Sequence, residues 1–152
     1  TKEEERSRLW QARHDSIYSN KALRPGCDCY TTDICVPISR LAESILTARA
    51  DIEASPLIGK IIGHVGDGNF HIAYLIEPDN AAELAEAERL ADRLVERALK
   101  VGGTASGEHG IGLAKLKYLR KEHGDAIDSM KAIKAALDPT GIMNPGKLGQ
   151  VG

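Results

Sequence analysis

The stretch LIGKIIGHVGDGNFHIAYLIE, residues 57–77, predicts an antiparallel β-hairpin. Its two arms, 57–65 and 70–77, are rich in the β-branched and aromatic residues that favour strands. Between the arms stands Asp67-Gly68, a dipeptide typical of two-residue hairpin turns. We therefore expect the residues on either side of this turn to face each other across the hairpin.

Two histidines bracket the predicted turn, and their spacing carries the clearest chemical signal in the chain. A two-residue turn at Asp67-Gly68, or a four-residue loop over 66–69, places His64 directly opposite His71. Opposed side chains have β-carbons about 4.5–5.5 Å apart, so two imidazoles can bind one divalent ion. A loop with an odd number of residues would abolish this pairing.

The sequence around the hairpin predicts an α+β fold. Apolar residues recur every three or four positions in several segments, which predicts helices, and Pro or Gly ends most of these segments. The order strand, helix, strand, strand, helix is that of an antiparallel sheet with its helices on one face. The expected helices cover 3–22, 39–54, the segment from the Asn80 cap to Gly102, 113–123 and 126–137, and a further strand covers 30–36.

The composition favours one globular domain and excludes some classes of function. The 152 residues are 42% apolar and 28% charged, which is enough for a hydrophobic core. A net charge of −2, with acidic and basic residues interspersed, gives no general attraction for nucleic acid. No apolar run approaches the roughly 18–20 residues that a membrane-spanning helix needs.

The start of the chain and its cysteines bear on processing and location. The chain begins Thr-Lys-Glu-Glu-Glu, without an initiator Met or a signal peptide, which predicts a processed chain or a fragment. Cys27, Cys29 and Cys35 are odd in number and clustered, which suits reduced thiols better than disulfides or a four-sulfur zinc site. We expect a cytoplasmic protein, either free or peripheral to the membrane.

Three further residues are candidates for chemistry. Glu108 lies in a glycine-rich segment and is the expected third ligand, because two His and one carboxylate commonly hold a catalytic metal. His109 is then a candidate base beside the metal, and a surface loop histidine is the alternative. Arg13 falls among apolar helical positions, where it either binds a substrate carboxylate or extends its guanidinium into solvent.

Three motifs in a fixed order make the chain resemble a known family. They are GHVGDGNFH at 63–71, SGEHGIG at 106–112 and DPTGIMNPGK at 138–147. They are similar to the C-terminal part of FAD-linked 2-hydroxy-acid dehydrogenases, the group of D-lactate dehydrogenase, the glycolate oxidase flavin subunit and D-2-hydroxyglutarate dehydrogenase. The resemblance implies that residues 1–152 form a ferredoxin-like cap domain and that the FAD-binding domain lies outside this chain, so the chain alone is expected to be inactive.

The resemblance also implies a reaction and a role for each candidate residue. A D-2-hydroxy acid is oxidised to the 2-oxo acid with hydride transfer to FAD. The electron acceptor stays open, and a homodimer is compatible with the resemblance. The implied site consists of His64, His71 and Glu108 as ligands of a divalent ion, most simply zinc, His109 as the base, Arg13 and Asn69 as substrate contacts, and Asn144 at the edge of FAD.

One departure from the family pattern bears on the substrate. Some relatives carry a lysine near the position of Thr31 that helps to bind a second carboxylate, whereas residues 30–33 here include no cation. We therefore expect a monocarboxylic hydroxy acid such as D-lactate. Two alternatives stay open: a stand-alone metal-binding or assembly module without activity, and a small metallohydrolase that uses the same ligand set.

Overall fold

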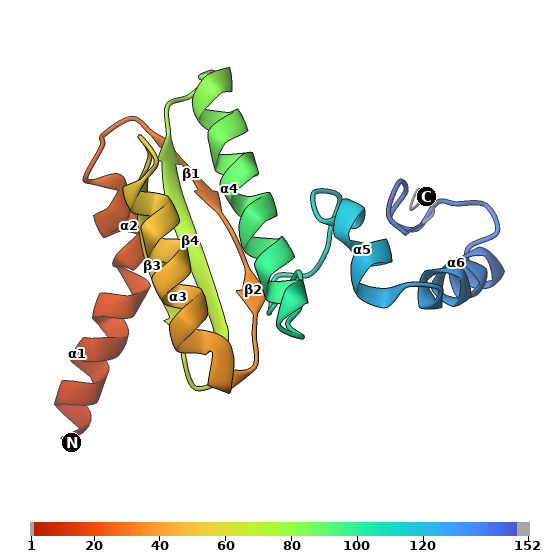
Figure 1. Ribbon diagram of the computed structural model, residues 1–152, viewed down its shortest axis with the longest axis horizontal. Helices are drawn as coiled ribbons and strands as arrows, with labels where there is room; N and C mark the ends of the chain where they lie inside the picture. The colour runs from red at the N-terminus through yellow and green to blue at the C-terminus, as the bar shows by residue number, and fades with distance from the viewer. Residues whose placement is uncertain (1, 149–152) are drawn as a thin grey trace.

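A long central strand, β4, organises the computed structural model (Figure 1). Residues 2–148 are described, and residues 1 and 149–152 of the predicted 1–152 domain lie outside the described residues. The fold is α+β, as the order of elements predicts. In chain order the described elements are α1 (Glu3–His14), α2 (Ser16–Lys21), β1 (Asp28–Thr31), β2 (Ile34–Cys35), α3 (Ile38–Glu53), β3 (Ile58–His64), β4 (Asn69–Ile76), α4 (Ala81–Lys100), α5 (Leu116–His123) and α6 (Ala126–Leu137).

The strand pairs of this sheet are antiparallel and all include β4. β3 pairs along one edge of β4, and β1 and then β2 pair along the other edge. Beyond β2, an isolated bridge joins Cys35 to Thr104. The order β-α-β-β-α matches a ferredoxin-like split unit in which this bridge takes the place of the last strand.

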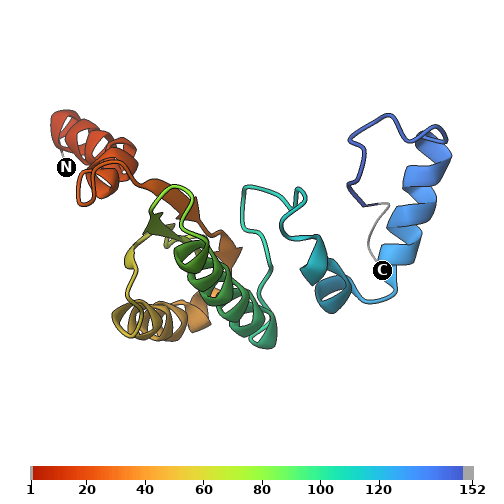
Figure 2. The ribbon, with the colours of Figure 1, turned by 90° about the horizontal axis from the view of Figure 1, so that it is seen from above.

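Helices α3 and α4 cover one face of the sheet (Figures 1 and 2). Helix α4 begins at an Asn80 cap, whose side chain accepts a hydrogen bond from the Glu83 N–H at 3.1 Å. The side chains that face the helices from β4 include Phe70 and Tyr74, and each is at most 1% exposed. Burial of one large apolar side chain contributes about 1.5–3 kcal/mol. The buried residues of α4 recur at helical spacing: Ala87, Leu90, Ala91, Leu94, Val95 and Ala98.

The C-terminal part of the chain forms a second, smaller cluster beyond α4 (blue in Figure 2). Leu119 of α5 and Ile127 of α6 are its buried centre. The Tyr118 hydroxyl donates a hydrogen bond to Asp92 of α4, which ties this cluster to the sheet domain. No helix within residues 2–148 is both long enough and apolar enough to cross a membrane.

Two predicted elements are interrupted. The helix expected over 3–22 divides at Asp15 into α1 and α2, where the Ser16 hydroxyl donates to the Arg13 carbonyl at 2.6 Å and competes with helical bonding. The strand expected over 30–36 begins earlier and breaks between β1 and β2.

The apolar residues expected to be buried on the first helix are largely exposed. Leu9 and Trp10 are 69% and 51% exposed, and no residue of α1 is buried. Helix α1 therefore projects from the sheet domain (Figure 1).

The hairpin register differs from the predicted one. His64 pairs with Asn69 and His71 pairs with Ile62, so the two histidines are not directly opposite. The connecting loop is 65–68, closed by a hydrogen bond from the Asp67 N–H to the His64 carbonyl at 2.9 Å. Because this loop also has an even number of residues, both histidines still point to the same face, as diagonal neighbours.

The physical reason for the shift lies at Gly68. Its φ is 79°, and a β-carbon there would lie 2.0 Å from the Val36 carbonyl oxygen. The Val36 N–H also donates to the Gly68 carbonyl at 3.0 Å. Gly68 is thus fixed against the end of β2 instead of at the centre of the turn, and the turn centre moves one residue toward the N-terminus.

Candidate active site

A cavity of about 520 Å³ opens on the sheet face that α3 and α4 leave uncovered. A β-carbon at Gly59 would lie 3.1 Å from Ile52 of α3, so odd positions of β3 face the helices and even positions face the cavity. The lining combines strand residues with the end of α1, the start of α2 and the loop after α4. Its principal members are Lys60, Ile62, Thr31, His71, Ala73, Arg13, Glu108, His109 and Lys115.

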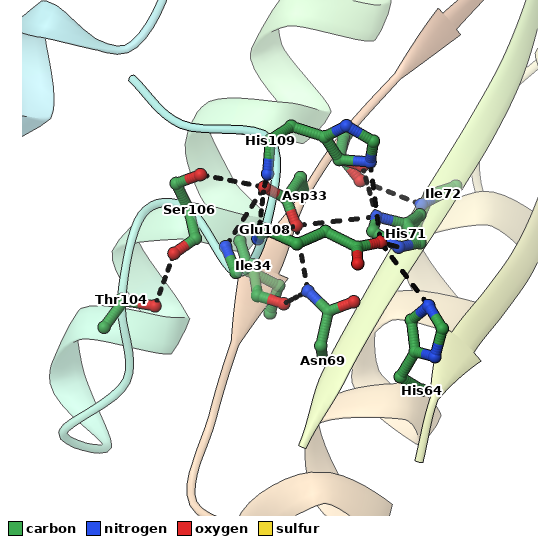
Figure 3. A network of polar contacts seen from close by, with 12 residues as sticks. Asp33, Ile34, His64, Asn69, His71, Ile72, Thr104, Ser106, Glu108 and His109 are labelled. Carbon is green, nitrogen blue, oxygen red and sulfur yellow. Dashed lines mark hydrogen bonds and ion pairs between the residues drawn. The ribbon is translucent and has the colours of Figure 1, made fainter. Parts of the chain in front are cut away.

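Three predicted metal ligands converge beside this cavity (Figure 3). The Nε2 atoms of His71 and His64 lie 2.9 Å and 3.5 Å from the same atom, Oε1 of Glu108. One donor atom from each residue lies within 4.8 Å of the other two. Donors bound to one zinc ion at about 2.0–2.2 Å lie at most about 4.4 Å apart, and both measured Nε2–Oε1 distances fall within this limit.

The hydrogen bonds of His71 show which of its nitrogens faces the other ligands. Nδ1 lies 3.2 Å from the Thr32 carbonyl oxygen, which can only accept, so Nδ1 carries a proton. Nε2 then faces the Glu108 carboxylate at 2.9 Å. Two acceptors at that distance require a proton or a cation between them. The donor set therefore fits a divalent ion held by Nε2 of His71 and a carboxylate oxygen of Glu108.

The remaining candidate ligand, His64, contacts the guanidinium of Arg13. Arg13 Nη2 donates to His64 Nε2 at 2.5 Å, so this nitrogen is an acceptor with its lone pair directed into the site. Arg13 also lies over the Trp10 ring, 5.8 Å from its centroid, at the exposed end of α1. The guanidinium thus uses the lone pair that a metal ion would use, and the two compete for His64.

His109 lies next to the three ligands without joining them. Its Nε2 is 3.7 Å from Oε1 of Glu108, and its ring centroid is 5.1 Å from that of His71. The side chain is 62% exposed, so it can meet a molecule in the cavity. Glu108 and His109 are consecutive, and the glycine-flanked loop directs both side chains toward His71, as Figure 3 shows. Both residues line the cavity.

Asp33 is a buried carboxylate behind the site, 3% exposed. Burial alone would raise the pKa of Asp33. Hydrogen bonds and one nearby cation outweigh burial and hold the pKa of Asp33 well below its usual range. The donors are the His109 N–H, the Asn69 amide and the Ser106 hydroxyl, and the cation is the Lys115 ammonium. Asp33 is therefore a fixed negative charge at neutral pH.

Residues 1–148 match the family described as FAD linked oxidases, C-terminal domain. The chain belongs to this family. The match confirms the resemblance seen in the three motifs, and it covers the cavity, the three candidate ligands and the C-terminal cluster.

The similar proteins within this family are oxidoreductases. A probable mitochondrial D-lactate dehydrogenase of Danio rerio is 52% identical over 96% of the chain, which spans 30% of that protein. The mitochondrial cytochrome-type D-lactate dehydrogenase of Arabidopsis thaliana is 45% identical over 95% of the chain and 26% of its own length. The glycolate oxidase subunit GlcD of Escherichia coli K12 is 35% identical over 95% of the chain and 29% of its length. The chain thus spans under a third of each.

Two residues expected to contact the substrate and the flavin do not join the three candidate ligands. Asn69 is 5% exposed, and its amide nitrogen donates to Asp33 Oδ1 at 2.8 Å and to the Ile34 carbonyl at 2.9 Å. It supports Asp33, and only its Oδ1 has no hydrogen-bond partner among the described residues. Asn144 follows α6 with a φ of 46°, and its Oδ1 accepts a hydrogen bond from Lys147 Nζ at 3.4 Å.

Sequence reasoning missed Asp33 and Lys60. Asp33 stood inside a run taken as a continuous strand, and the polar pair Thr32-Asp33 was the available signal that this strand breaks. Lys60 pairs with Ala73, which pairs on its other side with Thr31, so these residues form one row across the sheet. β1 has no cation near Thr31, but Lys60 on β3 supplies one in the same row. Only the strand register shows that Lys60 and Thr31 share this row.

Proposed function

We propose that this chain is the substrate- and metal-binding half of a flavin-dependent dehydrogenase that oxidises a D-2-hydroxy acid to the 2-oxo acid. The observation that carries this function is the convergence of His64, His71 and Glu108 at a cavity that Arg13 and His109 also line. Membership of the FAD-linked oxidase family supports the flavin chemistry. The FAD-binding domain is proposed to lie in the part of the protein outside this chain.

Each residue has a part in the proposed reaction. His64, His71 and Glu108 hold a divalent ion, for which zinc suits two imidazoles and a carboxylate. When bound, the ion lowers the pKa of the substrate hydroxyl and FAD accepts two electrons as hydride. The reaction removes a hydride from C2 and a proton from the hydroxyl, and the products are the 2-oxo acid and reduced flavin.

Arg13 and His109 act on the substrate itself. Arg13 is proposed to leave His64 and bind the substrate carboxylate, which offers two acceptor oxygens to its planar guanidinium. This exchange releases the lone pair of His64 for the metal ion. His109, which is exposed beside Glu108, accepts the hydroxyl proton at a ring nitrogen. Asn69 and Asn144 stay predictions as contacts of substrate and flavin.

The length of the substrate depends on the far end of the cavity. The absence of a cation on β1 favours a monocarboxylic acid such as D-lactate, and two relatives are named as D-lactate dehydrogenases. Lys60, however, lies in the same row as Thr31 and lines the cavity. A substrate panel therefore measures how far Lys60 offsets the preference for a monocarboxylic acid. The panel contains D-lactate, glycolate, D-2-hydroxybutyrate and D-2-hydroxyglutarate.

The test uses the full-length protein reconstituted with FAD and zinc. Anaerobic mixing with D-lactate should bleach the flavin absorbance, and removal of the metal with a chelator should suppress this bleaching until zinc is restored. Metal binding without any flavin reduction across the panel would favour the stand-alone metal-binding module. Ester or amide hydrolysis without flavin would favour the metallohydrolase. Sedimentation of the same protein tests the predicted homodimer.

A further inference from the structure

We propose that Asp33 is a positioning residue, which holds the third metal ligand and the base at the site through the backbone of the loop that carries them. This role rests on the proposed function, because it concerns the same ligands and base. Asp33 itself lies behind these side chains and is not assigned to the metal or to the substrate. The loop it holds consists of residues 106–109.

The interruption between β1 and β2 places Asp33 beside His71. The pairing register on β4 is the same before and after the interruption, so Asp33 stands across from His71. At this point the Thr32 N–H donates to the Ile72 carbonyl at 2.9 Å, and the Thr32 hydroxyl accepts from the Ile72 N–H at 2.9 Å. This side-chain bond replaces a regular ladder bond and frees the chain to direct the Asp33 carboxylate toward the loop.

The carboxylate accepts hydrogen bonds from three successive backbone N–H groups of that loop (Figure 3). The Gly107 and His109 N–H groups donate to Oδ2 at 3.0 Å and 2.9 Å, and the Glu108 N–H donates at 3.2 Å. Consecutive N–H groups that converge in this way form an anion-binding nest. The anion here belongs to the protein, and its removal would leave the three N–H groups without their partner.

Side-chain donors complete the surroundings of Asp33. The Ser106 hydroxyl donates to Oδ2 at 2.8 Å, the Asn69 amide to Oδ1 at 2.8 Å, and Lys115 Nζ lies 3.3 Å from Oδ2. In the alternative cluster of Asp33, His71 and His109, the His71 atom that faces Asp33 is Nδ1, which donates to the Thr32 carbonyl and has no free lone pair for a metal. The favoured ligand set is therefore His64, His71 and Glu108.

The close approach of the loop depends on a glycine. A β-carbon at Gly107 would lie 1.8 Å from the Asn69 amide nitrogen and 2.9 Å from Asp33 Oδ1. Any other residue there would displace the Asn69 amide from Asp33 or move the loop away from the carboxylate. This contact joins Asp33, Asn69 and Gly107, which lie on three separate segments. It fixes the backbone position from which the Glu108 and His109 side chains extend.

The C-terminal cluster offers a matched control. Asp138 is 6% exposed and accepts hydrogen bonds from the Ile142 and Met143 N–H groups at 3.0 Å each, with Lys134 as its cation. Asp33→Asn and Asp138→Asn therefore each neutralise a buried carboxylate that holds a loop, and only the first loop carries site residues. Both variants are made in the full-length protein.

Two measurements test the role of Asp33. Amide hydrogen exchange should become faster in 106–109 in Asp33→Asn and faster in 138–143 in Asp138→Asn. Calorimetric titration with zinc alone should show an affinity about 10–100-fold weaker in Asp33→Asn, the range for outer partners of metal ligands, and an unchanged affinity in Asp138→Asn. A folded Asp33→Asn with the exchange and zinc affinity of the wild type would overturn the role.

Two further outcomes are also decisive. If Asp33→Asn does not fold, Ser106→Ala is the second variant, because it removes one hydrogen-bond donor to the Asp33 carboxylate. A severalfold loss of zinc affinity at an unchanged melting temperature supports the positioning role of Asp33. An unchanged zinc affinity overturns it. If the wild type binds no zinc, the metal site of the proposed function is what fails. The role of Asp33 is then decided by the flavin reduction rate, since a lower kcat at constant KM supports it and an unchanged kcat overturns it.

Discussion

Asp33 and Asp138 hold two loops by the same physical means, and the loops differ in what they carry. Each aspartate is buried, accepts backbone N–H groups and has a lysine beside it. The loop at Asp33 faces the open side of the sheet and presents Glu108 and His109 to a cavity. The loop at Asp138 closes the C-terminal cluster. Both regions thus use a buried aspartate to hold a loop, and we propose a functional role only for the loop that lies beside the two histidines of the hairpin.

The largest expected difference between the two regions concerns histidine. His109→Ala should lower the rate of flavin reduction by D-lactate by about 10²–10⁴-fold, because it removes a general base. His123→Ala in α5 is the control, and it should leave the rate unchanged. Stopped-flow absorbance of the full-length protein measures both variants. A His109→Ala enzyme as fast as the wild type would exclude His109 as the base.

A second prediction compares carboxylates. Glu108→Gln should weaken zinc binding by at least the roughly 10–100-fold that changes in outer partners cause, because it removes a charged ligand. Glu96→Gln on α4 breaks only a surface ion pair with Lys121 and should bind zinc like the wild type. Calorimetric titration of the two variants gives the comparison. Equal affinities would assign the metal to another ligand set.

Arg13 allows a third comparison within one helix. Arg13→Met should raise KM for D-lactate about tenfold or more, because hydrogen bonds to charged groups contribute about 1.5–3 kcal/mol. It should not weaken zinc binding, since Arg13 competes with the metal for His64 Nε2. Arg8→Met, also on α1, should change neither quantity. Weaker zinc binding in Arg13→Met would show that the guanidinium supports the metal instead of competing with it.

The smallest effect concerns the stability of the C-terminal region. The Lys134 ammonium and the N–H groups of Met143 and Ile142 hold the pKa of Asp138 below its usual range. The resulting stability is present above the unfolded pKa of about 3.9 and is lost as the pH falls through the folded pKa. Asp138→Asn should therefore melt at a lower temperature than the wild type at neutral pH, and the gap should narrow below about pH 4. Thermal melts across pH measure this, and a gap independent of pH would contradict it.

The same two regions show how far the sequence could predict the structure. Helical periodicity located α3 and α4 to within a few residues, because their buried residues recur at helical spacing. The ends of α6 were located by the Gly124 and Pro139 breaks that flank it. The structure brings His64, His71 and Glu108 together as expected, because an even loop keeps the two histidines on one face in either register. Their role as metal ligands stays a prediction. The register itself depends on the contact of Gly68 with Val36, which local turn preferences do not contain.

Long-range contacts account for what the sequence did not predict at the site. The position of Asp33 follows from a break in a β-branched run, and its partners lie in a loop more than seventy residues away. Lys60 enters the cavity through strand pairing. These relations are set by tertiary packing, which periodicity and motif spacing do not report.

Anomalous X-ray diffraction at the zinc edge tests the proposed metal centre most directly. The crystals are of the full-length protein grown with zinc and D-lactate. One peak is expected about 2.0–2.2 Å from Nε2 of His64, Nε2 of His71 and a carboxylate oxygen of Glu108, with the Arg13 guanidinium turned to the substrate carboxylate. No peak between these three residues, or a peak bound to Asp33 and His109, would contradict it.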